Sequence, residues 1–496
     1  RRGGVRREAG RPSPDYRYLH PSGSFRCFPA EQLESRLLED ACALVYSAEA
    51  QPGGAFALYD MGRCVTGFIE TAVTVKEETE LLLLFDEILT DGDVDITRMD
   101  TTNAVRWRLP AGARTLLTFE PYTFRYLKAV CLGGACEVES VLVREAVCGA
   151  KLHKTAQSDP VLAKIYDAAV ESFRQNAVDV FMDCPSRERA GWLCDSFFTA
   201  RTEYALTGKS EIERCFLENY LLPERFPHIP EGMVPMCYPA DHTDGVFIPN
   251  WAMWLVLELA EYLERSGDRE LVGRFRPRVY GLIRYFDRFL NGDGLLEKLE
   301  SWVFVEWSKA NDLVQDVNYP SNMLYAKMLD CAGALYGDEA LRERSRAMQE
   351  TIRAQSFDGA FFRDHAVRRD GRLSVEPERT ETCQYYAFFC GTARREDGRF
   401  AGLWRTLTED FGPQRRQTGA HPDVFFSNAF IGNYLRLELL YRAGLFGSLR
   451  REIAGYFASM AERTGTLWEH DSPTASCCHG FASHVVCWLD GIASGA

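Results

Sequence analysis

The sequence predicts two domains, an N-terminal β-sandwich over residues 1–155 and an (α/α)6 barrel catalytic domain over residues 156–496. Three observations predict this fold. The chain has 496 residues, more than one hydrophobic core usually organises. Its hydrophobic content of 46% and charged content of 26% are globular values. Its N-terminal part carries strand signals, whereas the remainder carries helical periodicity.

The predicted sandwich depends on short apolar runs separated by turn residues. Val73–Val75 and Leu81–Phe85 are such runs, and Asp91–Asp93 has the Asp-Gly-Asp composition of a turn. Phe124–Val130 alternates between apolar and polar residues, and the pattern returns near Val143. Several short strands with turns between them favour a sandwich.

The pattern changes to helical at Ser158-Asp159-Pro160, where a capping residue precedes a proline in the first turn of a helix. The domain boundary is therefore expected near residue 155. Gly208, Gly267 and Gly292 mark expected helix ends. With the first helix, about twelve are predicted, which suits an inner ring of six inside an outer ring of six. The later candidates are about 195–207, 210–222, 248–266, 269–290, 321–336, 338–355, 380–391, 398–408, 427–444, 447–463 and 480–494.

The net charge restricts the class of partner. At −14 and with a pI near 5.3, the chain would repel a phosphate backbone, so nucleic acid is not expected as a partner. A neutral substrate fits better. No run of residues approaches the roughly 18–20 consecutive apolar residues that span a bilayer, so no membrane partner is expected either. The oligomeric state is left open, with a homodimer among the alternatives.

Cysteine usage and the N-terminal segment both favour a cytoplasmic location. The 16 cysteines are scattered without framework spacing, as expected for reduced thiols. Basic residues at Arg1–Arg7 are followed by Glu8 and Pro12 rather than by an apolar segment, so no secretion signal is visible. Cys477 and Cys478 lie near His479 and His484, which are zinc-ligand types, but no second ligand pair stands in register and no metal is predicted.

The densest functional segment is Asp183–Asp195, between two predicted helices. It holds three carboxylates, two arginines and a tryptophan, with Pro185 stiffening the loop and Gly191 permitting a bend. Sugar hydrolysis needs a protonated carboxyl for the leaving oxygen, and further carboxylates and an aromatic face for the sugar. The structural alternative is that arginines pair with carboxylates and that Asp195 caps the helix beginning at Ser196.

A second candidate is Thr466–Asp471, followed by Ser476–Gly480. A Trp-Glu pair beside His and Asp, in a loop between two late helices, has the composition of a carbohydrate site. The alternative is an ordinary surface glutamate after a buried tryptophan.

Two further segments carry aromatic and polar residues. Trp302–Ser308 alternates aromatic residues with Glu306 and could form a lip of the barrel that carries a sugar platform, or could simply pack into the core. A loop after Pro239 offers a similar mixture with the same alternative. Its candidates are His242, Asp244, Asn250 and Trp251.

These residues resemble bacterial α-L-rhamnosidases of glycoside hydrolase family 78. The family signature Asp-Cys-Pro-x-Arg-Glu-Arg-x-Gly-Trp-x-Gly-Asp is met over Asp183–Asp195 at every fixed position but one, because Cys194 stands where the family has Gly. Its later Trp-Glu and Ser-x-x-His elements resemble Trp468-Glu469 and Ser476–His479, with Cys478 at the position of the family's usual Asn.

The resemblance also covers the β region, through Tyr59–Arg63, Phe85–Glu87 and Glu120–Tyr126, and so spans nearly the whole chain. The family usually continues past the barrel into a C-terminal β domain, whereas this sequence stops at Ala496. A short variant and a fragment are both consistent with that end.

The resemblance implies inverting hydrolysis of terminal α-L-rhamnosyl residues in glycosides or oligosaccharides, without an organic cofactor. Carried over by position, Glu188 becomes the general acid and Glu469 the general base. The open alternatives are a hydrolase of another sugar, a polysaccharide lyase, which the acidic loop disfavours, and a noncatalytic carbohydrate-binding protein. The residues assigned to sugar binding are Asp183, Arg187, Trp192, Asp195, Trp307 and His479, with Glu306 and Trp251 in addition.

Overall fold

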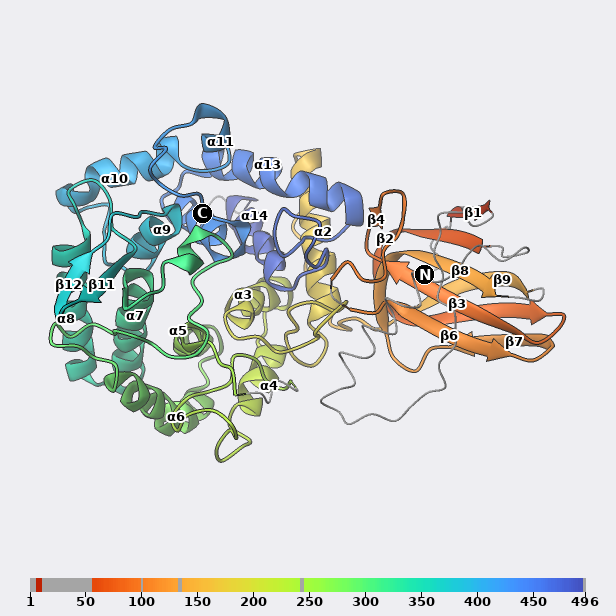
Figure 1. The fold of residues 1–496 in the computed structure, drawn as a ribbon, viewed down its shortest axis with the longest axis horizontal. Coiled ribbons are helices and arrows are strands. Elements are labelled where there is room, and N and C mark those ends of the chain that lie inside the picture. The colour runs from red at the N-terminus through yellow and green to blue at the C-terminus, as the bar shows by residue number, and fades with distance from the viewer. Residues whose placement is uncertain (1–5, 11–55, 100, 133–135, 241–244, 494–496) are drawn as a thin grey trace.

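The computed structural model describes residues 6–10, 56–99, 101–132, 136–240 and 245–493. It contains an antiparallel β domain and a larger domain in which helices form a ring (Figure 1). His242 and Asp244, two of the candidates above, lie outside the described residues. No helix in the described part of the chain is long and apolar enough to cross a membrane.

The β domain is one curled antiparallel sheet rather than two separate sheets. Its strands are β1 (Arg6–Gly10), β2 (Phe56–Val75), β3 (Thr79–Asp86), β6 (Ala104–Leu109), β7 (Gly112–Leu117), β8 (Tyr122–Leu132) and β9 (Cys136–Glu145). A two-stranded β4–β5 ladder (Leu89–Thr90, Asp93–Val94) lies beside it.

The long strand β2 explains how a single sheet curls. Its first half pairs with β1 and β8, and its second half pairs with β7 and β9. The β2–β8 register shifts between Asp60 and Val65, an irregularity of the kind that bends a strand. Strands from both halves bury one apolar core that includes Ile69, Leu83 and Phe124, so the sandwich prediction is confirmed in this curled form.

The helices form two rings, as predicted. The inner ring is made of α3 (Asp195–Thr207), α5 (Pro249–Ser266), α7 (Tyr319–Tyr336), α9 (Glu381–Phe389), α12 (Tyr434–Arg442) and α14 (Val485–Ala493). The outer ring is made of α2 (Pro160–Asn176), α4 (Glu211–Asn219), α6 (Arg269–Asp287), α8 (Glu339–Ser356), α10 (Ala401–Arg405) and α13 (Phe446–Thr464). Successive inner helices contact one another from α3 to α12, and α14 contacts α3.

The burial pattern explains this assignment to rings. The inner helix α5 is buried around most of its circumference, including Trp251 and Trp254, because its neighbours cover it on all sides. The outer helix α8 buries only one face, with Leu341, Met348 and Ile352 pointing inward. Each of the predicted helices has a counterpart in the described chain.

Some local expectations were wrong. The helix expected over 427–444 begins only at Tyr434, because Phe430 and Ile431 have non-helical backbone angles. The helix expected over 269–290 ends at Asp287. A three-stranded sheet of β10 (Val317–Asn318), β11 (His365–Arg369) and β12 (Arg372–Val375) was not predicted, and neither was the short α11 (Arg415–Thr418).

Candidate active site

The loop that joins α2 to α3 is braced largely by its own residues. The Asp183 carboxylate accepts a hydrogen bond from the Ala190 N–H at 3.0 Å, and the Asp183 N–H donates to the Ala190 carbonyl at 3.0 Å. The Arg189 N–H donates to the Cys184 carbonyl at 3.1 Å. A Cβ added at Gly191 would lie 2.6 Å from the Tyr238 carbonyl oxygen, so the bend at this position requires glycine. The segment is therefore a shaped loop, as its composition predicted.

Cys194 occupies the place where the signature has glycine, and the structure gives that difference a physical meaning. Its φ is +73°, in the region that glycine adopts readily and that L residues rarely adopt. The structural alternative, in which Asp195 caps the helix, is not observed, because α3 begins at Asp195 itself and the Asp195 carboxylate contacts His479. Cys194 is fully buried, and a strained residue held in this way beside Asp195 is typical of a functional loop.

The late loop between α13 and α14 meets the first loop directly. The Gly480 N–H donates to the Asp183 carbonyl at 2.7 Å, and the His479 N–H donates to the Leu467 carbonyl at 2.9 Å. The Glu469 N–H donates to the Ser476 carbonyl at 3.0 Å. Two segments almost 300 residues apart thus form one wall.

That wall forms one side of a cavity of about 180 Å³. All of the residues assigned to catalysis or sugar binding except Glu306 line it. The candidate Asn250 does not, and its amide instead donates to the Ser321 hydroxyl and accepts from the Phe304 N–H. Five lining residues were not assigned to the site. Trp302 and Phe304 belong to the aromatic segment that was singled out, whereas Met236, Ile248 and Phe430 gave no sequence signal. The lining comprises Asp183, Arg187, Glu188, Trp192, Asp195, Met236, Ile248, Trp251, Trp302, Phe304, Trp307, Phe430, Glu469 and His479.

Arg187 lies between the two candidate catalytic carboxylates. Its Nε is 3.1 Å from Glu188 Oε1, and its Nη2 is 3.5 Å from Glu469 Oε2. The Trp192 indole N–H donates to Glu188 Oε2 at 2.7 Å. The Glu188 side chain is 31% exposed, whereas that of Glu469 is 9% exposed. One carboxylate therefore stands at the open side of the cavity and the other in its depth.

Burial and charge shift the pKa values of the groups behind these carboxylates. Burial and the nearby Glu188 charge raise the pKa of Asp183 to about 7. Burial alone would lower the pKa of His479, but its hydrogen bond to Asp195 and the charges of Glu469, Asp195 and Asp183 raise it to about 9. His479 Nε2 is 2.9 Å from Asp195 Oδ1. At neutral pH the cavity floor thus carries an imidazolium among carboxylates.

Glu306 does not line the cavity, so its expected contact with sugar is corrected. Its carboxylate is fully buried and accepts hydrogen bonds from the Ser308 and Thr382 hydroxyls, both at 2.5 Å. The Asn428 and Gly432 N–H groups donate to its other oxygen at 3.0 and 2.8 Å. Burial raises the pKa of Glu306 to about 8. Glu306 therefore anchors the kinked segment that brings Phe430 to the cavity.

The zinc alternative at Cys477 and Cys478 finds no ligand cluster. Among the described residues, the metal-ligand types whose atoms approach within 4.8 Å are Asp183, Cys184 and His479. Cys478 instead contacts the Asn176 amide at 3.5 Å, at the position where the signature would have Asn. All cysteines within the described residues are free.

Taken together, the helices form a double ring, and carboxylates and aromatic rings line one cavity in it, an arrangement that can hold a small polar ring such as a sugar. The sequence profile of the bacterial alpha-L-rhamnosidase six-hairpin glycosidase domain matches residues 154–491. The chain therefore belongs to this family.

Individual relatives agree with this placement. An alpha-L-rhamnosidase from Formosa agariphila is 21% identical in an alignment of 472 residues, which covers 88% of this chain and 48% of that protein. An alpha-L-rhamnosidase from an Alteromonas species is 22% identical over 46% of this chain and 25% of its own length. This chain thus spans half or less of the length of these two curated relatives.

Solved structures share the fold. A family 78 rhamnosidase from Bacillus sp. GL1 superimposes with a TM-score of 0.77 at 20% identity, covering 94% of this chain and 49% of its own. A rhamnosidase from Klebsiella oxytoca, solved with rhamnose bound, has a TM-score of 0.74 at 17% identity and covers 100% of this chain and 97% of its own.

Proposed function

We propose that this chain hydrolyses terminal α-L-rhamnosyl residues of glycosides or oligosaccharides with inversion at the anomeric carbon. The observation that carries the proposal is that Glu188 and Glu469, from two distant loops, both line one small cavity and flank the same Arg187 guanidinium. Paired carboxylates around a sugar-sized cavity are the requirement of glycoside hydrolysis. The relatives from Formosa and Klebsiella are named as rhamnosidases, and the latter binds rhamnose.

In this proposal Glu188 protonates the leaving oxygen. Its greater exposure suits this role, because the leaving group must extend toward solvent. The Trp192 indole N–H donates to Oε2 of Glu188, and Arg187 Nε lies 3.1 Å from Oε1, so these two contacts orient the carboxyl group that donates the proton. Glu469, in the depth of the cavity, removes a proton from the attacking water. Arg187 keeps both carboxyl groups oriented between these steps.

The remaining lining residues would read the sugar. Asp195 holds one nitrogen of His479, and within the described residues His479 Nδ1 is buried without a hydrogen-bond partner. That N–H is available for a sugar hydroxyl, because an unmet buried donor favours a ligand that accepts from it. The aromatic side chains of Trp251, Phe304 and Phe430 supply an apolar surface for the C6 methyl group of a 6-deoxy sugar.

A hydrolase acting on another sugar is the main alternative on the same scaffold. A panel of chromogenic glycosides distinguishes the two, and α-L-rhamnoside should be hydrolysed preferentially. L-Rhamnose should inhibit more strongly than L-mannose, which adds one hydroxyl where the methyl group would meet apolar side chains. Equal inhibition by D-glucose would contradict the assignment, and binding without hydrolysis of any glycoside would favour a noncatalytic protein.

Inversion is tested by the product itself. If Glu469 activates a water, the carboxyl groups of Glu188 and Glu469 should be roughly 6.5–9.5 Å apart when substrate binds, and the first product should be β-L-rhamnose. Proton NMR of a fresh reaction, read before mutarotation, detects this anomer. An α-anomer as the first product would mean that Glu469 attacks carbon directly.

A further inference from the structure

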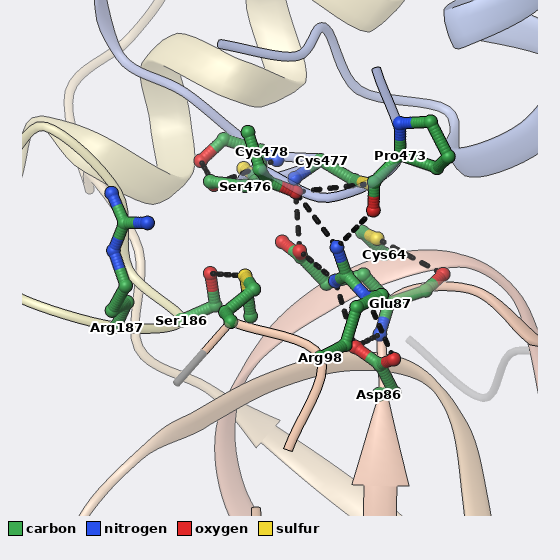
Figure 2. Close-up of polar contacts among 12 residues, drawn as sticks. Cys64, Asp86, Glu87, Arg98, Ser186, Arg187, Pro473, Ser476, Cys477 and Cys478 are labelled. Carbon is green, nitrogen blue, oxygen red and sulfur yellow. Dashed lines mark hydrogen bonds and ion pairs between the residues drawn. The ribbon is translucent and has the colours of Figure 1, made fainter. Parts of the chain in front are cut away.

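A buried charge cluster lies in the β domain where it faces the barrel (Figure 2). Asp86 ends strand β3, Glu87 follows it, and Arg98 comes from the segment between β5 and β6. Arg98 Nη2 is 2.8 Å from both Asp86 Oδ1 and Glu87 Oε2. The side chains of Asp86 and Glu87 are 0% exposed and that of Arg98 is 6% exposed. Three charged groups held out of water at such a junction require a specific arrangement of partners.

Those partners belong to the loop that carries Glu469. Arg98 Nη1 donates to the carbonyls of Pro473 and Ala475, both at 2.7 Å. Glu87 Oε2 accepts the Cys477 N–H at 2.9 Å. Figure 2 shows the Arg98 guanidinium aimed at this loop, with Asp86 and Glu87 on its other sides. The β domain therefore holds backbone groups on both sides of Ser476.

Ser476 transmits this restraint to Glu469. Its carbonyl accepts the Glu469 N–H at 3.0 Å, so the backbone at Glu469 is fixed by the residue that Arg98 and Glu87 bracket. Residues 471, 473 and 474 are exposed, and the loop has no helix or strand of its own to stabilise it. Arg98 itself does not line the cavity. Its influence on catalysis would therefore be indirect.

We propose that Arg98 is a positioning residue for Glu469, so that the β domain fixes the general base from outside the barrel. The proposal rests on the proposed function, in which Glu469 activates the attacking water. A planar guanidinium suits the task, because it donates at once to two carboxylates and two carbonyls in fixed directions. A displacement of about 1 Å in a catalytic group can cost about 10²-fold in rate, so a loose base loop should lower kcat.

The test compares Arg98→Ala in the wild-type chain and in a Glu469→Gln background. In the wild-type chain we expect kcat for an α-L-rhamnoside to fall at least about tenfold while KM changes less than about twofold, because no residue of the cavity lining is replaced. In the Glu469→Gln background the same substitution should cost almost nothing further. An equal loss in both backgrounds, or a loss confined to KM, would overturn the proposal. Arg98→Lys should not restore kcat, because lysine keeps the charge without the planar set of donors.

Two further variants cover a failure of Arg98→Ala to fold. Glu87→Gln keeps the shape of the side chain and removes its charge, and should lower kcat in the same direction but less. Glu145→Gln is the control, since Glu145 pairs across the same domain junction with Arg174 at 3.6 Å and within its own domain with Arg63 at 3.4 Å, and forms no ion pair with the loop. It should change kcat less than about twofold. A loss with Glu145→Gln as large as that with Glu87→Gln would show a general effect of the junction and contradict the proposal.

Hydrogen exchange separates this proposal from the proposed function. In Arg98→Ala the amides of Glu469 and Cys477 should exchange at least about tenfold faster, while those of the Asp183–Asp195 loop should be unchanged. Unchanged exchange at Glu469 overturns the positioning role whatever the chain hydrolyses. Full activity of Glu469→Gln would instead remove Glu469 as the base, and faster exchange would then still show that Arg98 holds the loop.

Discussion

The two loops that supply the proposed acid and base are held in different ways. The Asp183–Asp195 loop is braced by hydrogen bonds between its own residues, such as those joining Asp183 to Ala190. The Thr466–Gly480 loop also has internal hydrogen bonds, such as that from the Glu469 N–H to the Ser476 carbonyl, but its backbone is held in addition by Arg98 and Glu87 of the other domain. The loop of the proposed acid is therefore a local motif, whereas the loop of the proposed base depends on packing between the domains.

The largest loss of activity should come from replacing Glu188, the proposed acid. The same experiment distinguishes the roles of Glu188 and Glu469. Glu188→Gln should slow glycosides with poor leaving groups by at least about 10²-fold, and activated aryl glycosides less, because these need little protonation. Glu469→Gln should slow both substrate types alike. Steady-state kinetics on the two substrates measures the difference. If Glu188→Gln lowered the rate by the same small factor on both substrate types, Glu188 would not be the general acid.

The next largest effect is expected on the stability of the chain, at the contact between the two loops. A Cβ at Gly480 would lie 2.5 Å from the Met182 carbonyl oxygen and 3.0 Å from the Asn176 Cβ, so Gly480→Ala must push the loops apart. We expect a loss of up to about 3 kcal/mol in the free energy of unfolding, measured with denaturant. Gly402→Ala is the control, because nothing lies within 4 Å of its added Cβ. If Gly480→Ala were as stable as the wild-type chain, the two loops would be able to move apart at little cost in free energy.

The ionic contact between the loops predicts a pH dependence. The pKa of His479 is raised from 6.5 to about 9 in the folded chain, chiefly by Asp195 against the opposing effect of burial. Its stabilising contribution is therefore complete below about pH 6.5 and is lost as pH rises through about 9. Between pH 7 and 10 the wild-type chain should lose about 2 kcal/mol more than His479→Gln. Parallel pH profiles of unfolding would contradict the charged state of His479.

The smallest effect on sugar binding is expected at Trp307, which lies at the exposed rim of the cavity and belongs to neither of the two loops. Trp307 lines the cavity but is 42% exposed, so Trp307→Ala should weaken L-rhamnose binding only about three- to tenfold. Calorimetric titration measures this affinity. A loss as large as that of a buried lining residue such as Trp251 would show that Trp307 closes over the sugar.

Much of the fold was predictable because its signals are local. The Pro160 helix start and the Gly208 and Gly267 helix ends obey capping rules that operate within a few residues. The helix expected from residue 427 was wrong because Glu306 accepts the N–H groups of Asn428 and Gly432, which competes with helical hydrogen bonds. That competition involves a partner more than 120 residues away, and no local pattern records it.

The sequence was sufficient to predict the fold class, the ends of most helices and the composition of both candidate loops, because periodicity and turn chemistry act over short distances along the chain. Tertiary structure alone decided that Glu306 lies behind the cavity and that Met236, Ile248 and Phe430 line it. It alone joined Glu87 to Cys477 across 390 residues of sequence. The physical reason is that burial, and hydrogen bonds between segments distant in the sequence, depend on how whole layers of the structure pack together. The residues that are neighbours along the chain do not record that packing.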